Sequence, residues 1–231
     1  MAVSSAHSGD WLNALPIATC GLRLGDEDVR ICVGLRLGCR LCEAHTCLCG
    51  ASVDVRGLHG LSCRKSAGRT SRHNYLNDVI FCALCKAGVP SLKEPSGLLR
   101  SDGKRPDGLT QIPMEAGKCV TWDITVTDTF AASNINLSSA AAGAAAENSA
   151  SKKVEKYSML PECYAFVPLA FETMGPVCTE GSDFIGKVGR KLQNISGDTR
   201  ETSFLWQRIS MAVQRFNAVC ILGTFQEPQE A

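Results

Sequence analysis

The sequence predicts an α/β fold, in which helices flank a mixed four-stranded sheet and a small zinc knuckle precedes this core. Three observations support the prediction. Runs of β-branched and aromatic residues alternate with runs of apolar residues at helical spacing. Cysteine and histidine cluster between Cys39 and Cys63. The chain has 231 residues, of which 45% are hydrophobic, and is therefore long enough to bury a sizeable core.

The N-terminal part of the chain contains a short apolar segment, 11–20, and two expected helices. The first helix is expected over 26–37, because its first three residues are acidic and complement the helix dipole. The second is expected over 72–86, where apolar residues recur at helical spacing. Ser71 offers an N-cap for this helix and Gly88 ends its pattern.

Three strands are expected after the second helix. The segment 91–95, which contains Glu94, forms a strand edge or its exit, and two further strands follow around 105–111 and 118–127. The last of these is rich in β-branched and aromatic residues, so we expect it to be buried.

The C-terminal half is expected to contain helices around one further strand. The Ala-rich stretch 138–160 has strong helix propensity. A strand is expected over 164–172, where Pro168 favours an edge position or a bulge. Two amphipathic helices and a loose tail complete the chain, at 183–193, 201–222 and 225–231.

Short cysteine and histidine spacings indicate a zinc site ahead of the second helix. Thirteen cysteines without a secretory signal favour free thiols and metal ligands over disulfide bonds. Zinc takes four sulphur or nitrogen ligands, which short chelating pairs at the two ends of a loop can supply. The preferred set is Cys47, Cys49, His59 and Cys63.

Other ligand sets remain open. The single residue between Cys47 and Cys49 is a tighter spacing than the usual two, so Cys42 or His45 is an alternative ligand. A set that we rank lower pairs two earlier cysteines with two that lie one turn apart in the second helix: Cys39, Cys42, Cys82 and Cys85.

Charge is balanced overall but uneven along the chain. The formal net charge of +1 gives no global attraction to nucleic acid or to a membrane. Residues 55–77 include no acidic residue. Both a solvated face and a contact with phosphate groups fit this run. The candidate nucleic-acid-binding residues within it are Arg64, Lys65, Arg69, Arg72 and His73.

The sequence offers no sign of a membrane or secreted protein. No apolar stretch is long enough to span a bilayer. The first residues lack the basic-then-apolar pattern of a secretory signal. We therefore expect an intracellular protein that makes no membrane contact.

Two aspartates on neighbouring expected strands are the strongest chemical signal in the chain. Asp107 follows a proline at the start of one strand, and Asp123 lies in the middle of the buried strand 118–127. A carboxylate buried in such a strand is costly unless it is paired or binds a metal ion. Two carboxylates from adjacent strands can hold one hard cation, such as Mg²⁺ or Mn²⁺, between them.

The series of elements and motifs is similar to that of a known protein family. The order helix, three strands, helix, strand, with Pro-Asp on one strand and Asp-x-Thr on the next, resembles the PD-(D/E)XK nuclease core. With the Cys/His knuckle it resembles the C-terminal zinc knuckle and restriction-like endonuclease of site-specific non-LTR retrotransposons and related reverse-transcriptase-derived proteins. The similarity covers roughly Leu35 to Thr224. Its motifs are Arg72-His73-Asn74, Arg105-Pro106-Asp107-Gly108, Trp122-Asp123-Ile124-Thr125-Val126 and Lys153-x-x-Lys156-Tyr157.

The resemblance implies a set of catalytic residues. The metal-binding acids of the family match Asp107 and Asp123, and the acid that often precedes them matches Glu94. The usual motif places a lysine two residues after the second acid, where this chain has Thr125. In the retrotransposon group the lysine lies on the following helix, which makes Lys153 the candidate and Lys156 the reserve.

The resemblance also implies a function. It predicts a DNA endonuclease that hydrolyses phosphodiester bonds with Mg²⁺ or Mn²⁺, carries zinc in its knuckle, and binds DNA and the element's RNA in the nucleus. The parent protein would carry a reverse transcriptase domain. The alternative is a catalytically inactive, zinc-containing nucleic-acid-binding remnant. The expected division is a helical connector, a knuckle, a nuclease domain and a tail, at 1–37, 38–66, 67–225 and 226–231.

Overall fold

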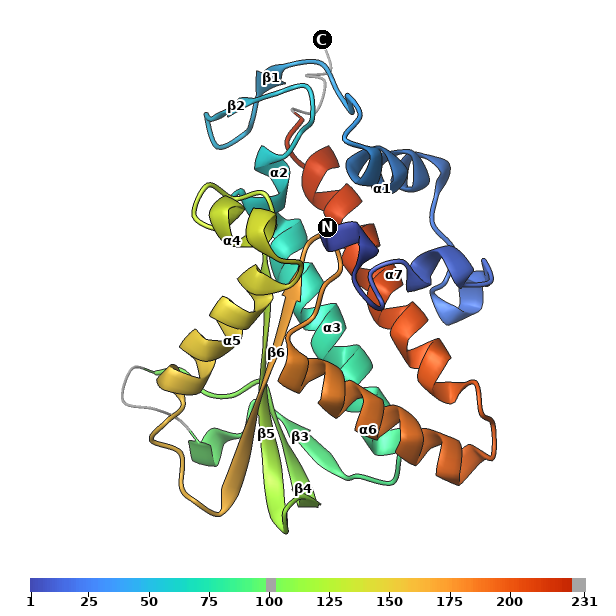
Figure 1. Ribbon diagram of the computed structural model, residues 1–231, viewed down its shortest axis with the longest axis vertical. Coiled ribbons are helices and arrows are strands. Elements are labelled where there is room, and N and C mark those ends of the chain that lie inside the picture. The colour runs from blue at the N-terminus through green and yellow to red at the C-terminus, as the bar shows by residue number, and fades with distance from the viewer. Residues whose placement is uncertain (99–102, 226–231) are drawn as a thin grey trace.

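The fold is built around one four-stranded mixed sheet, as the computed structural model shows for residues 1–98 and 103–225 (Figure 1). Its order is β3-β4-β5-β6, with antiparallel pairing between the first three strands and parallel pairing between the last two. The predicted mixed four-stranded sheet flanked by helices is therefore confirmed. The strands are β3 (Ser91–Lys93), β4 (Gly108–Glu115), β5 (Lys118–Thr127) and β6 (Tyr164–Glu172).

Helices cover both faces of this sheet (Figure 1). Side chains alternate along β5, so Trp122 and Ile124 enter the main core, whereas Asp123 points to the opposite face. The core face is covered by α3 (Ala67–Lys86) and α6 (Thr179–Ser196), on which α7 (Glu201–Leu222) packs. The face of Asp123 is covered by α5 (Ala144–Lys156), with α4 (Ile135–Ala140) packed against this helix.

A small Cys/His lobe lies against the end of α7. It consists of β1 (His45–Thr46), β2 (Ser52–Val53) and the short helix α2 (His59–Ser62). Gly60 allows α2 to approach α7 closely, because a Cβ atom there would lie 2.7 Å from the carbonyl oxygen of Cys220. The lobe is therefore fixed to α7 by backbone packing.

The segment before the lobe packs closely along α7. It contains short 3-10 turns and α1 (Asp26–Leu37), and its apolar residues form a second core cluster with α7. Trp11 donates its backbone N–H to Ser210 Oγ at 3.2 Å, and the ring of His7 stacks on Trp206 with 3.8 Å between ring centroids. The expected connector is thus an integral layer of the structure.

Several elements have the bounds that the sequence predicts. These are α1, β5, β6 and α7. Pro168 lies on β6, which is an edge strand as its proline favours. None of the helices within the described residues is long and apolar enough to cross a bilayer.

Other predicted bounds are wrong. Helix α3 begins at Ala67 rather than at 72, so Ser71 lies inside it. The Ala-rich stretch forms two helices rather than one, because Gly143 adopts a left-handed φ of 85° between them. Strand β4 begins at Gly108 rather than at 105, and α6 begins four residues earlier than 183. The predicted tail lies outside the described residues from 226 onwards.

Replacing Trp11 with alanine tests whether the N-terminal segment stabilises the whole fold. Trp11 is 6% exposed within the second core cluster, so its loss should lower the free energy of unfolding by about 3 kcal/mol. The neighbouring Leu12 is 60% exposed, and its replacement with alanine should cost less than about 0.5 kcal/mol. Urea unfolding measures both; equal losses would contradict the described packing.

Candidate functional site

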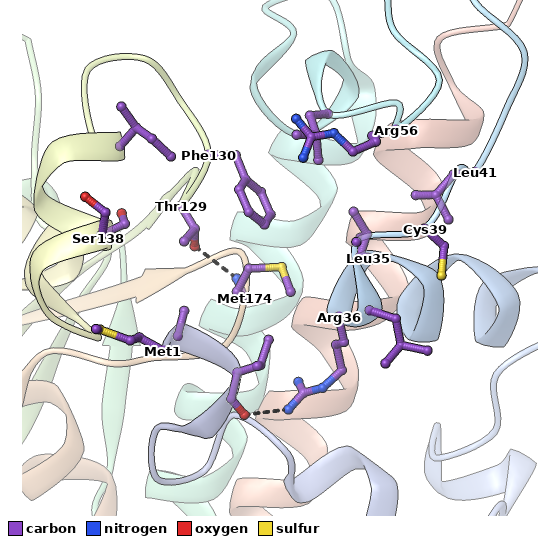
Figure 2. Close-up of a pocket in the computed structure, with 17 residues that line it drawn as sticks. Met1, Leu35, Arg36, Cys39, Leu41, Arg56, Thr129, Phe130, Ser138 and Met174 are labelled. Carbon is purple, nitrogen blue, oxygen red and sulfur yellow. Dashed lines mark hydrogen bonds between the residues drawn. The ribbon is translucent and has the colours of Figure 1, made fainter.

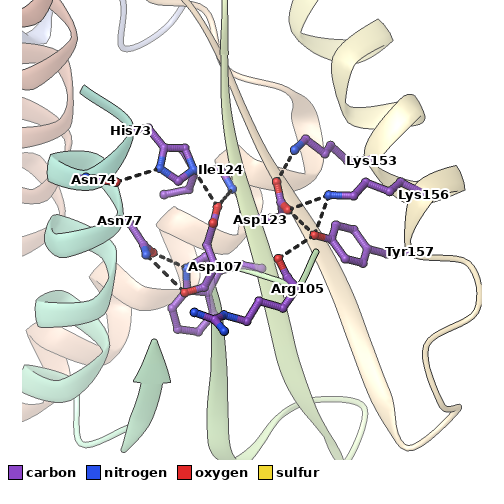
Figure 3. A network of polar contacts seen from close by, with 11 residues as sticks. His73, Asn74, Asn77, Arg105, Asp107, Asp123, Ile124, Lys153, Lys156 and Tyr157 are labelled. Carbon is purple, nitrogen blue, oxygen red and sulfur yellow. Dashed lines mark hydrogen bonds and ion pairs between the residues drawn. The ribbon is translucent and has the colours of Figure 1, made fainter. Parts of the chain in front are cut away.

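Asp107 is held at the start of β4 by backbone and side-chain bonds. Its N–H donates to the carbonyl oxygen of Trp122 at 2.9 Å, and its carbonyl accepts from the N–H of Glu94 at 3.0 Å. Its Oδ2 accepts a hydrogen bond from the N–H of Ile124 at 2.5 Å and lies 3.0 Å from His73 Nε2 (Figure 3). This contact raises the pKa of His73, the hydrogen bond to Asp107 being the main cause.

Asn77 on α3 connects Asp107 to the main core. Its Nδ2 donates to the carbonyl oxygen of Asp107 at 3.2 Å, and its Oδ1 accepts from Trp122 Nε1 at 2.8 Å (Figure 3). Trp122 is fully buried, and it fits only because position 108 is glycine: a Cβ atom on Gly108 would lie 1.9 Å from the indole ring. The position of Asp107 is therefore set by a buried indole and a helix.

Asp123 lies in the middle of β5, and its side chain is only 5% exposed. Its Oδ1 pairs with Lys153 Nζ, and its Oδ2 accepts a hydrogen bond from the hydroxyl of Tyr157 at 2.5 Å. Lys156 Nζ lies 3.6 Å from the same Oδ2 and donates to the Tyr157 hydroxyl at 2.8 Å (Figure 3). Two ammonium groups and a phenol thus compensate the burial of this carboxylate.

The two carboxylates have partners on different helices. Asp107 is bonded to His73 of α3, and Asp123 to side chains of α5 (Figure 3). The negative charge of Asp123 nevertheless contributes to the raised pKa of His73, and His73 and Lys153 line one cavity. The partners of the two aspartates, His73 and Lys153, therefore lie at the same cavity.

The side chain of Glu94 does not join this pair, although its backbone N–H bonds to Asp107. Its carboxylate is exposed and forms an ion pair with Arg105. Within residues 1–98 and 103–225, one group of three or more histidine, cysteine or acidic side chains has its ligand atoms all within 4.8 Å of one another, and it lies in the Cys/His lobe. The structure thus pairs Asp123 with both lysines and Asp107 with His73, and the Glu94 carboxylate joins neither.

The five predicted nucleic-acid-binding residues have different environments. Four of them line a cavity of about 510 Å³ beside the aspartates, whereas Lys65 is exposed outside it. Among the four, Arg72 is only 1% exposed, so its side chain offers almost nothing to the open surface. We call this space, lined by Arg64, Arg69, Arg72, His73 and Lys153, the basic cavity.

The Cys/His lobe brings together the preferred zinc ligands. Cys47 Sγ and Cys63 Sγ are 3.8 Å apart, and Cys49 Sγ lies 3.2 Å from His59 Nε2. Tetrahedral zinc with Zn–S bonds of about 2.3 Å places two sulphurs about 3.8 Å apart, so the set fits the ion. A hydrogen bond from the Ala51 backbone lowers the pKa of Cys49 to about 7, which favours the thiolate that zinc needs. These four residues could therefore bind zinc.

The alternative zinc ligands have other contacts. His45 Nε2 bonds to Thr224 Oγ1 at 2.9 Å, and its ring stacks on Phe225. The thiol of Cys42 donates to the carbonyl oxygen of Asp54 at 3.4 Å. Neither belongs to the four-residue group.

A second cavity has a different character. It measures about 410 Å³ and lies between the N-terminal segment, α1 and α4, with mainly apolar side chains around it (Figure 2). Arg36 crosses its edge to donate to the carbonyl oxygens of Ser8 and Val3 at 2.8 and 2.7 Å. This cavity therefore adds no catalytic group to the aspartate site.

Two residues of the site were not predicted: Asn77 and Tyr157. Both follow a site residue by one helical turn, since Asn77 comes four residues after His73 and Tyr157 four residues after Lys153. Residues at i and i+4 lie on the same face of a helix. That spacing is the signal from which both could have been found.

Comparison with known proteins does not assign the chain to a family. No family model matches the sequence, and no curated protein matches it. The functional argument therefore depends on the residues and their arrangement.

Replacing Cys63 with serine tests the zinc centre. We expect the purified protein to carry one zinc ion per chain and the Cys63→Ser variant to lose it, because a four-ligand site loses a thiolate. Cys42→Ser should retain zinc and is the matched control. A chromogenic chelator measures the metal released after the thiols are blocked. Retention in Cys63→Ser together with loss in Cys42→Ser would assign the ligands differently.

Replacing Asn77 with alanine tests the connection between Asp107 and the core. It leaves the Trp122 N–H and the Asp107 carbonyl without this partner, so the free energy of unfolding should fall by about 1–3 kcal/mol. Asn74 is exposed on the same helix, and Asn74→Ala should change stability little. Chemical denaturation of the two variants measures the difference. Equal losses in the free energy of unfolding would show that Asn77 does not connect Asp107 to the core.

Proposed function

We propose that this protein is a metal-dependent endonuclease that hydrolyses phosphodiester bonds in DNA. The observation that carries the proposal is that the partners of the two aspartates on adjacent strands, His73 for Asp107 and Lys153 for Asp123, line the same basic cavity. Acidic groups, a positioned cation and a basic approach surface together suit attack on a phosphate ester.

The two aspartates fit a hard divalent cation. Carboxylate oxygens are the ligands that Mg²⁺ prefers, and Mg²⁺ is commonly held by one or two carboxylates, with water and phosphate oxygens in its other positions. Asp107 and Asp123 would hold Mg²⁺ or Mn²⁺ in this way. Such an ion, when bound, supplies Lewis acidity toward a phosphate oxygen and makes bound water more acidic.

Lys153 is the better candidate for the catalytic lysine. It pairs with Asp123 and also lines the basic cavity, so its ammonium group can face a phosphate that lies there. Lys156 instead contacts the Tyr157 hydroxyl, and its Nζ lies 4.4 Å from the centroid of that ring. We therefore assign charge stabilisation to Lys153 and the positioning of Asp123 to Tyr157.

The resemblance to the endonucleases of non-LTR retrotransposons gives this activity a setting. In that setting the chain is derived from such an element, acts in the nucleus and originally followed a reverse transcriptase domain. The Cys/His lobe and the basic residues would then contact DNA, with the element's RNA as a second ligand, through contacts to phosphates that are largely independent of sequence.

An inactive nucleic-acid-binding remnant is the second candidate. Thr125 stands where the usual nuclease motif has lysine, and Asp123 is already paired with Lys153, Lys156 and Tyr157. Such a closed polar network can persist for stability alone.

Nicking of supercoiled plasmid DNA tests the catalytic proposal. With Mg²⁺ we expect conversion to open circles, and a loss of at least about 100-fold in rate for Asp107→Ala, Asp123→Ala and Lys153→Met, since each removes a charged group from the site. Lys152→Met is the matched control, because Lys152 is exposed on the same helix.

The outcomes separate the two candidates. Nicking by the wild type that is lost in the aspartate variants supports the enzyme. A wild-type protein that binds DNA but does not nick it supports the remnant. Nicking that survives both aspartate substitutions would place the activity elsewhere or in a contaminant.

A further inference from the structure

We propose that the basic cavity holds one backbone phosphate of the bound DNA strand, next to the phosphate that is cleaved. The inference rests on the proposed function and specifies where the strand lies. It makes the cavity a binding subsite in its own right, separate from the two aspartates.

The lining of the cavity matches an anion. Its charged side chains are Arg64, Arg69, Arg72 and Lys153, with the imidazole of His73, and no carboxylate is among the lining residues. Hydroxyl groups of Ser66 and Thr70 add hydrogen-bond donors. Guanidinium groups bind phosphate oxygens through directed, charge-assisted hydrogen bonds.

One of the lining residues is a buried cation. Arg72 is only 1% exposed, and its Nη1 donates to Asn217 Oδ1 at 2.7 Å. Its buried Nε has no hydrogen-bond partner. Burial lowers the pKa of Arg72, and the buried carboxylate of Asp128 opposes this effect electrostatically without a direct ion pair between the two described side chains. A buried guanidinium without a directly bonded anion is costly, so an anion in the cavity would stabilise this arrangement.

The N-terminus of α3 adds to the positive electrostatic potential of the cavity. This helix has 20 residues, no acidic residue in its first turn and no side-chain hydrogen bond at its N-cap Ser66. Its first two turns contribute Arg69, Thr70 and His73 to the cavity. The N-terminus of a helix carries partial positive charge and favours phosphate.

The position of the cavity identifies the ligand as part of a strand. Lys153 lines it while pairing with Asp123, and His73 lines it while bonded to Asp107. The volume of about 510 Å³ exceeds what one phosphate group fills and extends to the neighbourhood of the aspartates. A chain that places one phosphate at the aspartates would thus place its neighbour among the arginines.

Salt-dependent DNA binding in EDTA tests this subsite without requiring cleavage. A fluorescent DNA duplex is titrated with wild type, with the Arg64→Ala/Arg69→Ala double variant and with Lys86→Ala/Lys191→Ala as the control, which removes the same two charges at exposed positions outside the cavity lining. We expect the Arg64→Ala/Arg69→Ala variant to bind about 10-fold more weakly and its log Kd against log salt slope to fall by about 1, the contribution of one phosphate. The control variant should change the slope by less than about half of that.

Titration with inorganic phosphate distinguishes the source of the ligand. A backbone subsite should bind the free anion on the order of 100-fold more weakly than DNA, because the strand makes further contacts. Equal affinity for phosphate and DNA would make the cavity a site for a small phosphate compound and overturn the proposal.

The proposal and the catalytic assignment can fail separately. An unchanged slope in the Arg64→Ala/Arg69→Ala variant, or an equal change in Lys86→Ala/Lys191→Ala, overturns the subsite even if the wild type nicks plasmid. Loss of binding specific to the Arg64→Ala/Arg69→Ala variant supports the subsite even if no nicking is seen. Thermal unfolding midpoints of all three proteins, expected to agree, exclude general unfolding as the cause.

Discussion

The burial of Asp123 is the constraint on which the rest of the site depends. A carboxylate at the centre of a sheet loses its hydration and must recover that free energy from partners. Here Lys153, Lys156 and Tyr157 supply it, and all three come from α5 or its C-cap. The Ala-rich helix is thereby held in register against β5, with small residues such as Ala146 and Ala150 packed on β6. The need to compensate the buried charge of Asp123 on β5 therefore fixes the position of α5.

The same pairing sets the chemistry that the site can perform. Removing one partner of a buried ion pair is more costly than replacing both, so Asp123 and its lysines act as a unit. In the proposed enzyme, the charge that keeps Asp123 stable in the resting protein is also the charge offered to the substrate.

The sequence predicts those elements whose signals are local. The buried strand around Trp122, the strand with Pro168 and the long final helix have strong periodic patterns, and their predicted bounds agree with the structure. The break at Gly143 was missed because a left-handed glycine decides it, and the start of α3 was missed in a first turn where Gly68 packs closely on Cys220. In the site, the aspartates were predicted from their places on two neighbouring expected strands and the lysines from the resemblance, whereas Asn77 and Tyr157 were missed although each follows a site residue by one helical turn. Arg72 was expected at the surface with its basic neighbours, and its burial depends on Asn217, 145 residues away.

The packing of the first residues on the last helix has a consequence for biosynthesis. The backbone N–H of Trp11 donates a hydrogen bond to Ser210, and the carbonyl oxygen of Gly21 accepts one from Arg215. These pairs are 199 and 194 residues apart in the sequence. Contacts so distant in sequence form slowly because a long loop must close first. While the ribosome is still translating, the apolar side of α1 and the ring of Trp11 lack their contacts with α7. The nascent polypeptide must therefore remain shielded from aggregation until its final helix has left the exit tunnel.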